Sequence, residues 1–358
     1  MGALIALSAG VVRHDAGVAQ PESASGRQDA EQKQSDGLSQ FIGKVLDQLS
    51  LSAWLPAAML VGCGAILVQL RAQGTFDLGA ALIALTAKPL GIVVVLFFAM
   101  ILATMISQAF SFGAIRFLEG YWSGALVTVR VYALLVRHQA RKRRRLYERQ
   151  EKCSRLATEQ AFRAMRAKNV SLRIVHLLEE IMAGDEDREL TDQELAVVAD
   201  VDWQTYSPPE LLGRIAQLAK AYAEYPQPHR LMPTKLGNVL RATEDKIVPD
   251  GTDTEGFMLR HGGAATPRLR QHHDQFRTRL DMYCTLVFVQ VALALGTVAL
   301  LGTGANPFAG TVIVTAIFAA LAATSYSAAI SSARGYCSAL RAIFDVAEPS
   351  VSLTAGSL

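Results

Sequence analysis

The polar side chains whose spacing best suits binding chemistry lie in the segment LMPTKLGNVLRATE, residues 231 to 244, and the Asp that follows it. Its Pro-Thr pair predicts the start of a helix with an apolar stripe on one side. The candidate site is the polar side of that helix, formed by Asn238, Arg241, Glu244 and Asp245. An arginine fork beside an amide suits a carboxylate, a phosphate or the end of a facing helix.

The same four side chains also fit a purely structural role. Arg241 and Asp245 are four residues apart, so they can pair along one helix face and tie it to acids of a neighbouring helix. We expect this internal tie, and we keep a ligand or partner site as the alternative.

A second charged feature precedes this segment by almost one hundred residues. Five consecutive basic residues on a helix point in nearly every direction, because each advances by about 100°. The sequence therefore predicts a collar that binds anionic lipid headgroups, formed by Arg137, Arg141, Lys142, Arg143, Arg144 and Arg145. A solvated helix is the alternative. No aromatic stacking platform accompanies the run, so we expect no nucleic-acid partner.

Motifs for catalysis are absent from the sequence, which has no GxSxG, HExxH, GxxxxGK[ST] or GxGxxG. His272 and His273 are adjacent, so their rings diverge on a helix, and we expect both to be solvated. The four cysteines form no CxxC pair, and Thr191 with Glu194 predicts a capping box within an acidic stretch that lacks EF-hand spacing. We expect no catalytic residue, metal or cofactor, although an enzyme without a recognisable motif stays open.

The composition of the chain is that of a membrane protein. Its 358 residues are 51% hydrophobic and only 19% charged. Uncharged blocks cover residues 48–70, 89–115 and 282–333, and a Gly-Asn-Pro cluster divides the last block into two. We therefore predict an all-α, polytopic membrane protein with four transmembrane helices in two pairs that flank a large cytoplasmic helical region.

The orientation follows from the basic residues. Residues 116–281 carry 27 of the 35 lysines and arginines, whereas only Arg71 and Lys88 lie between the first two spans. Because basic residues near a span resist translocation, we expect the large region and both termini to lie on the cytoplasmic side. We expect the protein itself to lie in the plasma membrane. Within that region the pattern predicts one helix from Tyr147 to Met182, stopped by Gly184.

The predicted organisation is a flexible tail (1–47), span one (48–71), a short non-cytoplasmic loop or interfacial helix (72–88), span two (89–115), the cytoplasmic region (116–281), span three (282–302), a hairpin (303–307), span four (308–333) and a cytoplasmic tail (334–358).

Three short motifs give the chain a family resemblance. Residues 233–244 follow the pattern P-T-[KR]-L-G-N-x-L-R-A-x-E, Glu119 to Trp122 read EGYW before an arginine-rich run, and Phe344-Asp345 follows the last span. In this the chain resembles a family of uncharacterised bacterial integral membrane proteins. The resemblance implies the architecture of two membrane pairs around a long loop, and it implies no activity.

The predicted function is a membrane-anchored interaction or signalling scaffold with a protein partner that the sequence does not identify. The spans lack acidic, basic and histidine side chains, which argues against a coupled transporter, because such transporters place ionisable groups at mid-membrane. An oligomeric channel is the alternative. Small residues recur in span four, namely Ala316, Ala319, Ala320, Ala323 and Ser327. They predict close packing within the protein's own bundle or a homo-oligomer contact.

Overall fold

The computed structural model describes residues 51–87, 90–122, 126–183, 191–199, 201–247, 265–302 and 308–355. The predicted tail, 1–47, and the hairpin, 303–307, lie outside the described residues. Every regular element in the described part is helical, which confirms the all-α prediction.

Within the described residues, four helices are long and apolar enough to cross a membrane, as predicted. They are α2 (Leu51–Gln73), α4 (Leu90–Glu119), α11 (Pro267–Leu301) and α12 (Phe308–Ala355). The short helix α3 (Leu78–Thr86) lies between the first two, and Asp77 caps it by accepting a 2.9 Å hydrogen bond from the backbone of Ala80.

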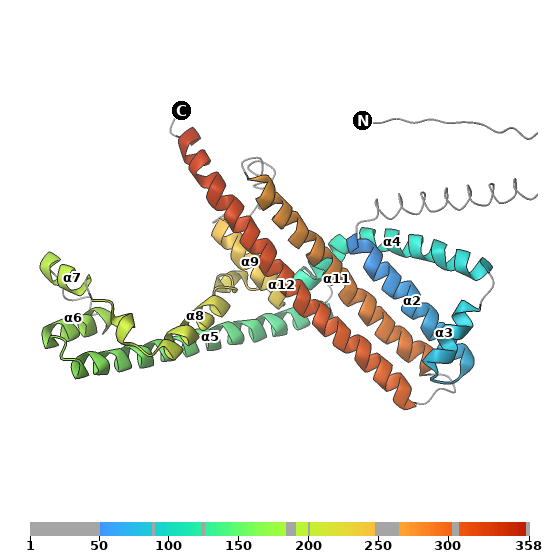
Figure 1. Cartoon of the computed structure of the whole chain (residues 1–358), viewed down its shortest axis with the longest axis horizontal. Coiled ribbons are helices and arrows are strands. Elements are labelled where there is room, and N and C mark those ends of the chain that lie inside the picture. Colours follow the sequence, from blue (N-terminus) through green and yellow to red (C-terminus); the bar gives the residue numbers. More distant parts are fainter. Residues whose placement is uncertain are drawn as a thin grey trace, which may run out of the picture. The chain divides into compact units, whose positions relative to one another are not determined.

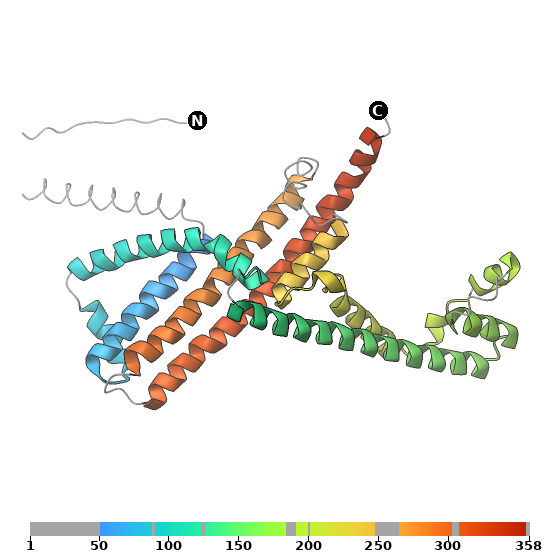
Figure 2. The same cartoon turned by 180° about the vertical axis from the view of Figure 1, so that it is seen from behind.

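Helix α11 is the centre of this bundle. It packs against α12, α2 and α4, and Figures 1 and 2 both show α11 and α12 side by side. A cluster of buried side chains joins α2 and α3 to the last two helices, and it contains Leu67, Leu70, Ala81, Val289, Leu293, Leu301 and Phe318.

The last two helices extend beyond the predicted spans. α11 starts fifteen residues before 282, at Pro267, where Thr266 caps it, and α12 continues from span four into the predicted C-terminal tail. In this extension His273 is buried against the ring of Tyr336, with ring centroids 4.9 Å apart. The prediction that His273 is solvated was therefore wrong, because the sequence did not show that α12 would cover it.

The region between the two pairs contains α5 (Leu126–Ala167), α6 (Leu172–Ala183), α7 (Asp192–Ala199), η1 (Trp203–Tyr206), α8 (Pro209–Tyr222), η2 (Pro228–Arg230) and α9 (Lys235–Ile247). We call α5 to α8 the arm. α5 and α8 run antiparallel, since Arg143 meets Tyr222 and Ala157 meets Ser207. A small core of Phe162, Met165, Val175 and Leu178 closes the end of the arm that contains α6.

The helix predicted from Tyr147 to Met182 is in fact two helices. The chain adopts a left-handed conformation at Asn169, with φ of 58°, and the Val170 N–H donates to the Met165 carbonyl. This is the hydrogen bond of a Schellman cap, for which Asn is the usual alternative to Gly. The break lets α6 fold back onto the end of α5.

Candidate functional site at helix α9

The start of α9 is built around the hydroxyl of Thr234. This hydroxyl accepts a 3.0 Å hydrogen bond from the Gly237 N–H, as an N-cap does, and donates a 2.9 Å bond to the Glu119 carbonyl. Glu119 is the last residue of α4, where helix carbonyls lack partners within the helix. One hydroxyl therefore caps two helices and joins them.

Two glycines allow this close approach. Gly120 has a φ of 104°, and a Cβ added there would lie 2.3 Å from Cγ of Pro233. A Cβ on Gly237 would lie 2.0 Å from the Glu119 carbonyl oxygen. Two of the three motifs that carry the family resemblance, EGYW and the signature of α9, therefore contact each other through their glycines.

Asn238 is completely buried and does not face solvent or a ligand. Its side-chain oxygen accepts a 2.8 Å bond from the Met232 N–H, and its amide donates to the carbonyls of Met232 and Thr234, at 3.0 and 2.8 Å. These bonds fix the turn before α9. The structure thus places Asn238 in a folding role.

Arg241 lies at the edge of the same junction. Its guanidinium carbon is 5.7 Å from the ring centroid of Tyr121, and it forms a 3.7 Å ion pair with Glu244. Burial raises the pKa of Glu244 above its ordinary value, and Arg241 and Arg230 offset only part of this effect. The space left among these groups is a cavity of about 10 Å³, enough for at most one water molecule.

Asp245 has a different partner from the expected one. It pairs with Arg230 of η2 at 2.5 Å, and both side chains are largely buried, whereas Arg241 pairs with Glu244. The expected pair of Arg241 with Asp245 is therefore not formed. Asp245 instead closes the turn between α8 and α9, where it also accepts a 3.4 Å bond from the Gln227 N–H.

Sequence reasoning missed the ion pairs that connect α9 to the rest of the protein. Glu224, just after α8, accepts two hydrogen bonds from Arg334 of α12, at 2.8 and 3.1 Å, and pairs with Lys235 at 3.2 Å. Burial alone would raise the pKa of Glu224, but the bonds from Arg334 and Lys235 outweigh it and hold that pKa below its ordinary value. Arg334 and Glu224 are 110 residues apart, so no local pattern could pair them.

Helix α9 also lies along α12. The Leu236 N–H donates to the Tyr326 hydroxyl at 3.4 Å, and Arg341 donates to the Thr243 hydroxyl at 3.2 Å. The apolar stripe predicted for α9 packs there, in a cluster formed by Leu236, Val239, Leu240, Leu280, Cys284, Ala329, Ile330, Ala333 and Cys337.

Five consecutive charges predict a uniform collar on α5. The basic run does not form one, because its side chains have different surroundings. Arg143 is half-buried on the ring of Tyr222, 4.8 Å from its centroid, and donates to the Tyr222 hydroxyl at 2.6 Å. Arg144 pairs with Glu148 at 2.7 Å. The remaining side chains of the predicted lipid site are exposed, and they are Arg137, Arg141, Lys142 and Arg145.

The part of the chain that the structure describes contains no group of three or more His, Cys, Asp or Glu side chains arranged to hold a metal ion. Comparisons with protein-family models, with curated proteins and with solved structures found no match. The space among Arg241, Glu244 and Tyr121 is nearly filled, and the polar side chains of α9 bond mainly to the turn before the helix, to Arg230 and within the Arg241–Glu244 pair.

Proposed function

We propose that this protein is a multi-pass membrane scaffold in which α9 holds the cytoplasmic arm to the spans. One observation carries this proposal: α9 is bonded at once to the end of α4, to α12 and, through Glu224, to the end of the arm. A junction that is filled by protein side chains suits the rigid presentation of a surface better than the capture of a substrate.

The topology is part of the proposal. The basic residues of 116–281 favour a cytoplasmic arm and cytoplasmic termini in the plasma membrane. The resemblance to uncharacterised bacterial membrane proteins is also part of the proposal, and it rests on the EGYW motif, the signature of α9 and Phe344-Asp345.

Native Cys153 offers a direct test of the orientation. It is partly exposed on α5, whereas Cys284 and Cys337 are buried. We expect a membrane-impermeant maleimide to label Cys153 only after the cells are permeabilised. Labelling of Cys153 on intact cells would reverse the proposed topology.

A homo-oligomer through α12 is the second part of the proposal. Small residues at a helix surface let a neighbouring helix approach closely in a membrane. The small residues singled out in span four are all exposed on α12, namely Ala316, Ala319, Ala320, Ala323 and Ser327. This exposure favours contact with a second copy over packing within one chain, and it keeps an oligomeric channel as the alternative function.

Photocrosslinking in native membranes tests whether the arm of the proposed scaffold binds a protein partner. A benzophenone amino acid at Leu172 of α6, which is 74% exposed, should capture a discrete protein, whereas the same probe at Leu295 of α11 should capture mainly lipid. The reconstituted protein should not raise ion flux across liposomes. Ion flux together with an arm that captures nothing would favour the channel and contradict the scaffold.

A further inference from the structure

The first turns of α5 are fixed beside the end of a span. The Trp122 indole N–H donates to the Phe117 carbonyl of α4 at 2.8 Å, and its ring meets the ring of Tyr132 of α5 edge-on, at 6.3 Å between centroids. Trp and Tyr favour the headgroup region of a bilayer. Because α4 is apolar enough to span and ends at Glu119, α5 begins near the level of the lipid headgroups.

One side of α5 is occupied by protein. Gln139 is buried, donates to the Pro233 carbonyl at 3.5 Å and accepts from the Tyr225 hydroxyl at 3.4 Å. Arg143, one turn later, packs on Tyr222. This side of α5 therefore faces α8 and the start of α9.

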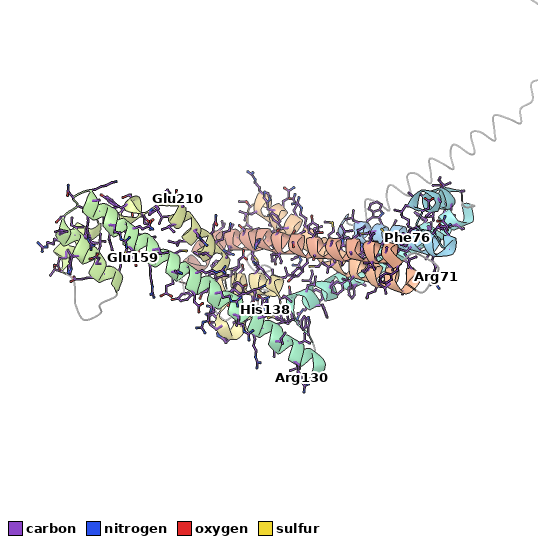
Figure 3. All side chains as sticks on the ribbon, turned by 90° about the horizontal axis from the view of Figure 1, so that it is seen from below. Arg71, Phe76, Arg130, His138, Glu159 and Glu210 are labelled. Atoms are coloured by element: carbon purple, nitrogen blue, oxygen red, sulfur yellow. The ribbon has the colours of Figure 1, made fainter. Side chains whose placement is uncertain are left out.

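The opposite side of α5 carries a stripe of exposed side chains that we call the basic stripe: Arg130, Leu134, Arg137, Arg141 and Arg145. Their spacing of three or four residues places them on one face, within roughly 80° of one another and away from Gln139, at about 100° per residue. Figure 3 shows this helix in front, with Arg130, His138 and Glu159 along it.

The composition of the basic stripe is that of a helix at a membrane surface. Leu134, within the stripe, is 67% exposed, and Val131, roughly 40° outside it, is 45% exposed. No arginine of the stripe has an ion pair within the described part of the chain, in contrast to Arg144. Exposed apolar side chains between unpaired arginines suit the surface of a bilayer, where anionic headgroups cover an apolar interior.

We infer that the basic stripe rests on the anionic surface of the bilayer that holds the spans, so that α5 lies along the interface and does not project from it. The arginines meet lipid phosphates, while Leu134 enters the boundary between headgroups and acyl chains. This inference rests on the proposed membrane insertion. It adds the direction of α5 and the face that touches lipid.

Fluorescence quenching by brominated lipid tests the inference on the full chain. The four native cysteines are replaced, and Leu134→Cys carries an environment-sensitive dye. The protein is placed in nanodiscs of brominated phosphatidylcholine with or without phosphatidylglycerol. Control dyes sit at Gln217→Cys, exposed on α8, which covers the opposite side of α5, and at Leu295→Cys, on the exposed face of a span.

The dye at position 134 should be quenched at least about twofold more than the dye at 217 in anionic discs, and added salt should reduce this difference. Changing Arg137, Arg141 and Arg145 together to Gln should abolish the excess quenching of the dye at position 134. A control with the same loss of charge elsewhere on the arm, at Arg173, Arg214 and Lys220, should retain it.

Equal quenching at 134 and 217, or an excess that the stripe variant and salt leave unchanged, would overturn the inference. The dye at Leu295 keeps this failure separate from that of membrane insertion. If brominated lipid quenches position 295 but not 134, the spans are inserted and only the docking of α5 is wrong. If position 295 is not quenched, the proposed insertion itself fails.

Discussion

Gly237 lies so close to the carbonyl oxygen of Glu119 that a Cβ on Gly237 would come within 2.0 Å of it. This oxygen belongs to the backbone and cannot move aside cheaply. We therefore expect Gly237→Ala to push α9 away from α4 and to lower the free energy of unfolding by at least about 2 kcal/mol. Thermal unfolding of the purified protein, followed by tryptophan fluorescence, measures this loss.

Gly213 is the matched control for this substitution. It lies within α8, and a Cβ there would meet nothing within 4 Å. Gly213→Ala should stabilise the protein by roughly 0.5–1 kcal/mol, since Ala is the better helix former. If both alanines have the same effect, the contact between Gly237 and Glu119 has no special importance.

Asn238 should be the most sensitive polar residue of the junction. Asn238→Asp keeps the acceptor for the Met232 N–H, but places a carboxylate beside the carbonyls of Met232 and Thr234. Because a buried charge without a donor is costly, we expect a loss of about 3 kcal/mol or more, measured by the same thermal assay. Gln217→Glu on the exposed side of α8 is the control, and its melting temperature should hardly change.

Glu224 and Glu244 should respond to pH in opposite directions. The pKa of Glu224 lies below its unfolded value of 4.5, so its ion pairs stabilise the fold fully above pH 4.5 and are lost as the pH falls through the folded pKa. Glu224→Gln should cost about 1–2 kcal/mol at neutral pH, and the deficit should shrink below pH 4.5.

Glu244 has a raised pKa, so its ionised form costs stability at neutral pH. Glu244→Gln should therefore raise the melting temperature at neutral pH, and the gain should vanish as the pH falls through the raised pKa, where wild-type Glu244 takes up a proton. Melting curves at several pH values measure both variants, with Glu210→Gln, exposed on α8, as the control. Parallel curves for the two variants would contradict the assigned environments.

Features that depend on neighbouring residues could be predicted from the sequence. Four spans and the helix start at the Pro-Thr pair follow from local patterns. One half of the predicted capping box is also present, since the Thr191 N–H donates to Glu194 at 3.2 Å. The left-handed turn at Asn169 was missed, because the apolar periodicity continues through it.

Features that depend on distant contacts could not be predicted. The pairing of Glu224 with Arg334 and the burial of His273 under Tyr336 need the packing of α8 and α11 on α12, which no local spacing encodes. The polar residues of α9 could be singled out from the sequence, but their separate partners could not. Asn238 turned inward because the turn before α9 offered three backbone groups to satisfy.

The exposed small residues of α12 give the last prediction. Ala320 and Ala323 face away from the bundle, and such residues allow two helices to approach to van der Waals contact. In a variant without native cysteines, Ala320→Cys should form a disulfide-linked dimer on mild oxidation in native membranes. Leu321→Cys is the control, since the next residue points about 100° away although it is also exposed.

Ala320→Leu with Ala323→Leu should abolish the dimer seen by single-molecule photobleaching in liposomes, because the added side chains hold the helices apart. Crosslinking that is equal at 320 and 321 would indicate random collision, and the small residues of α12 would then face lipid alone.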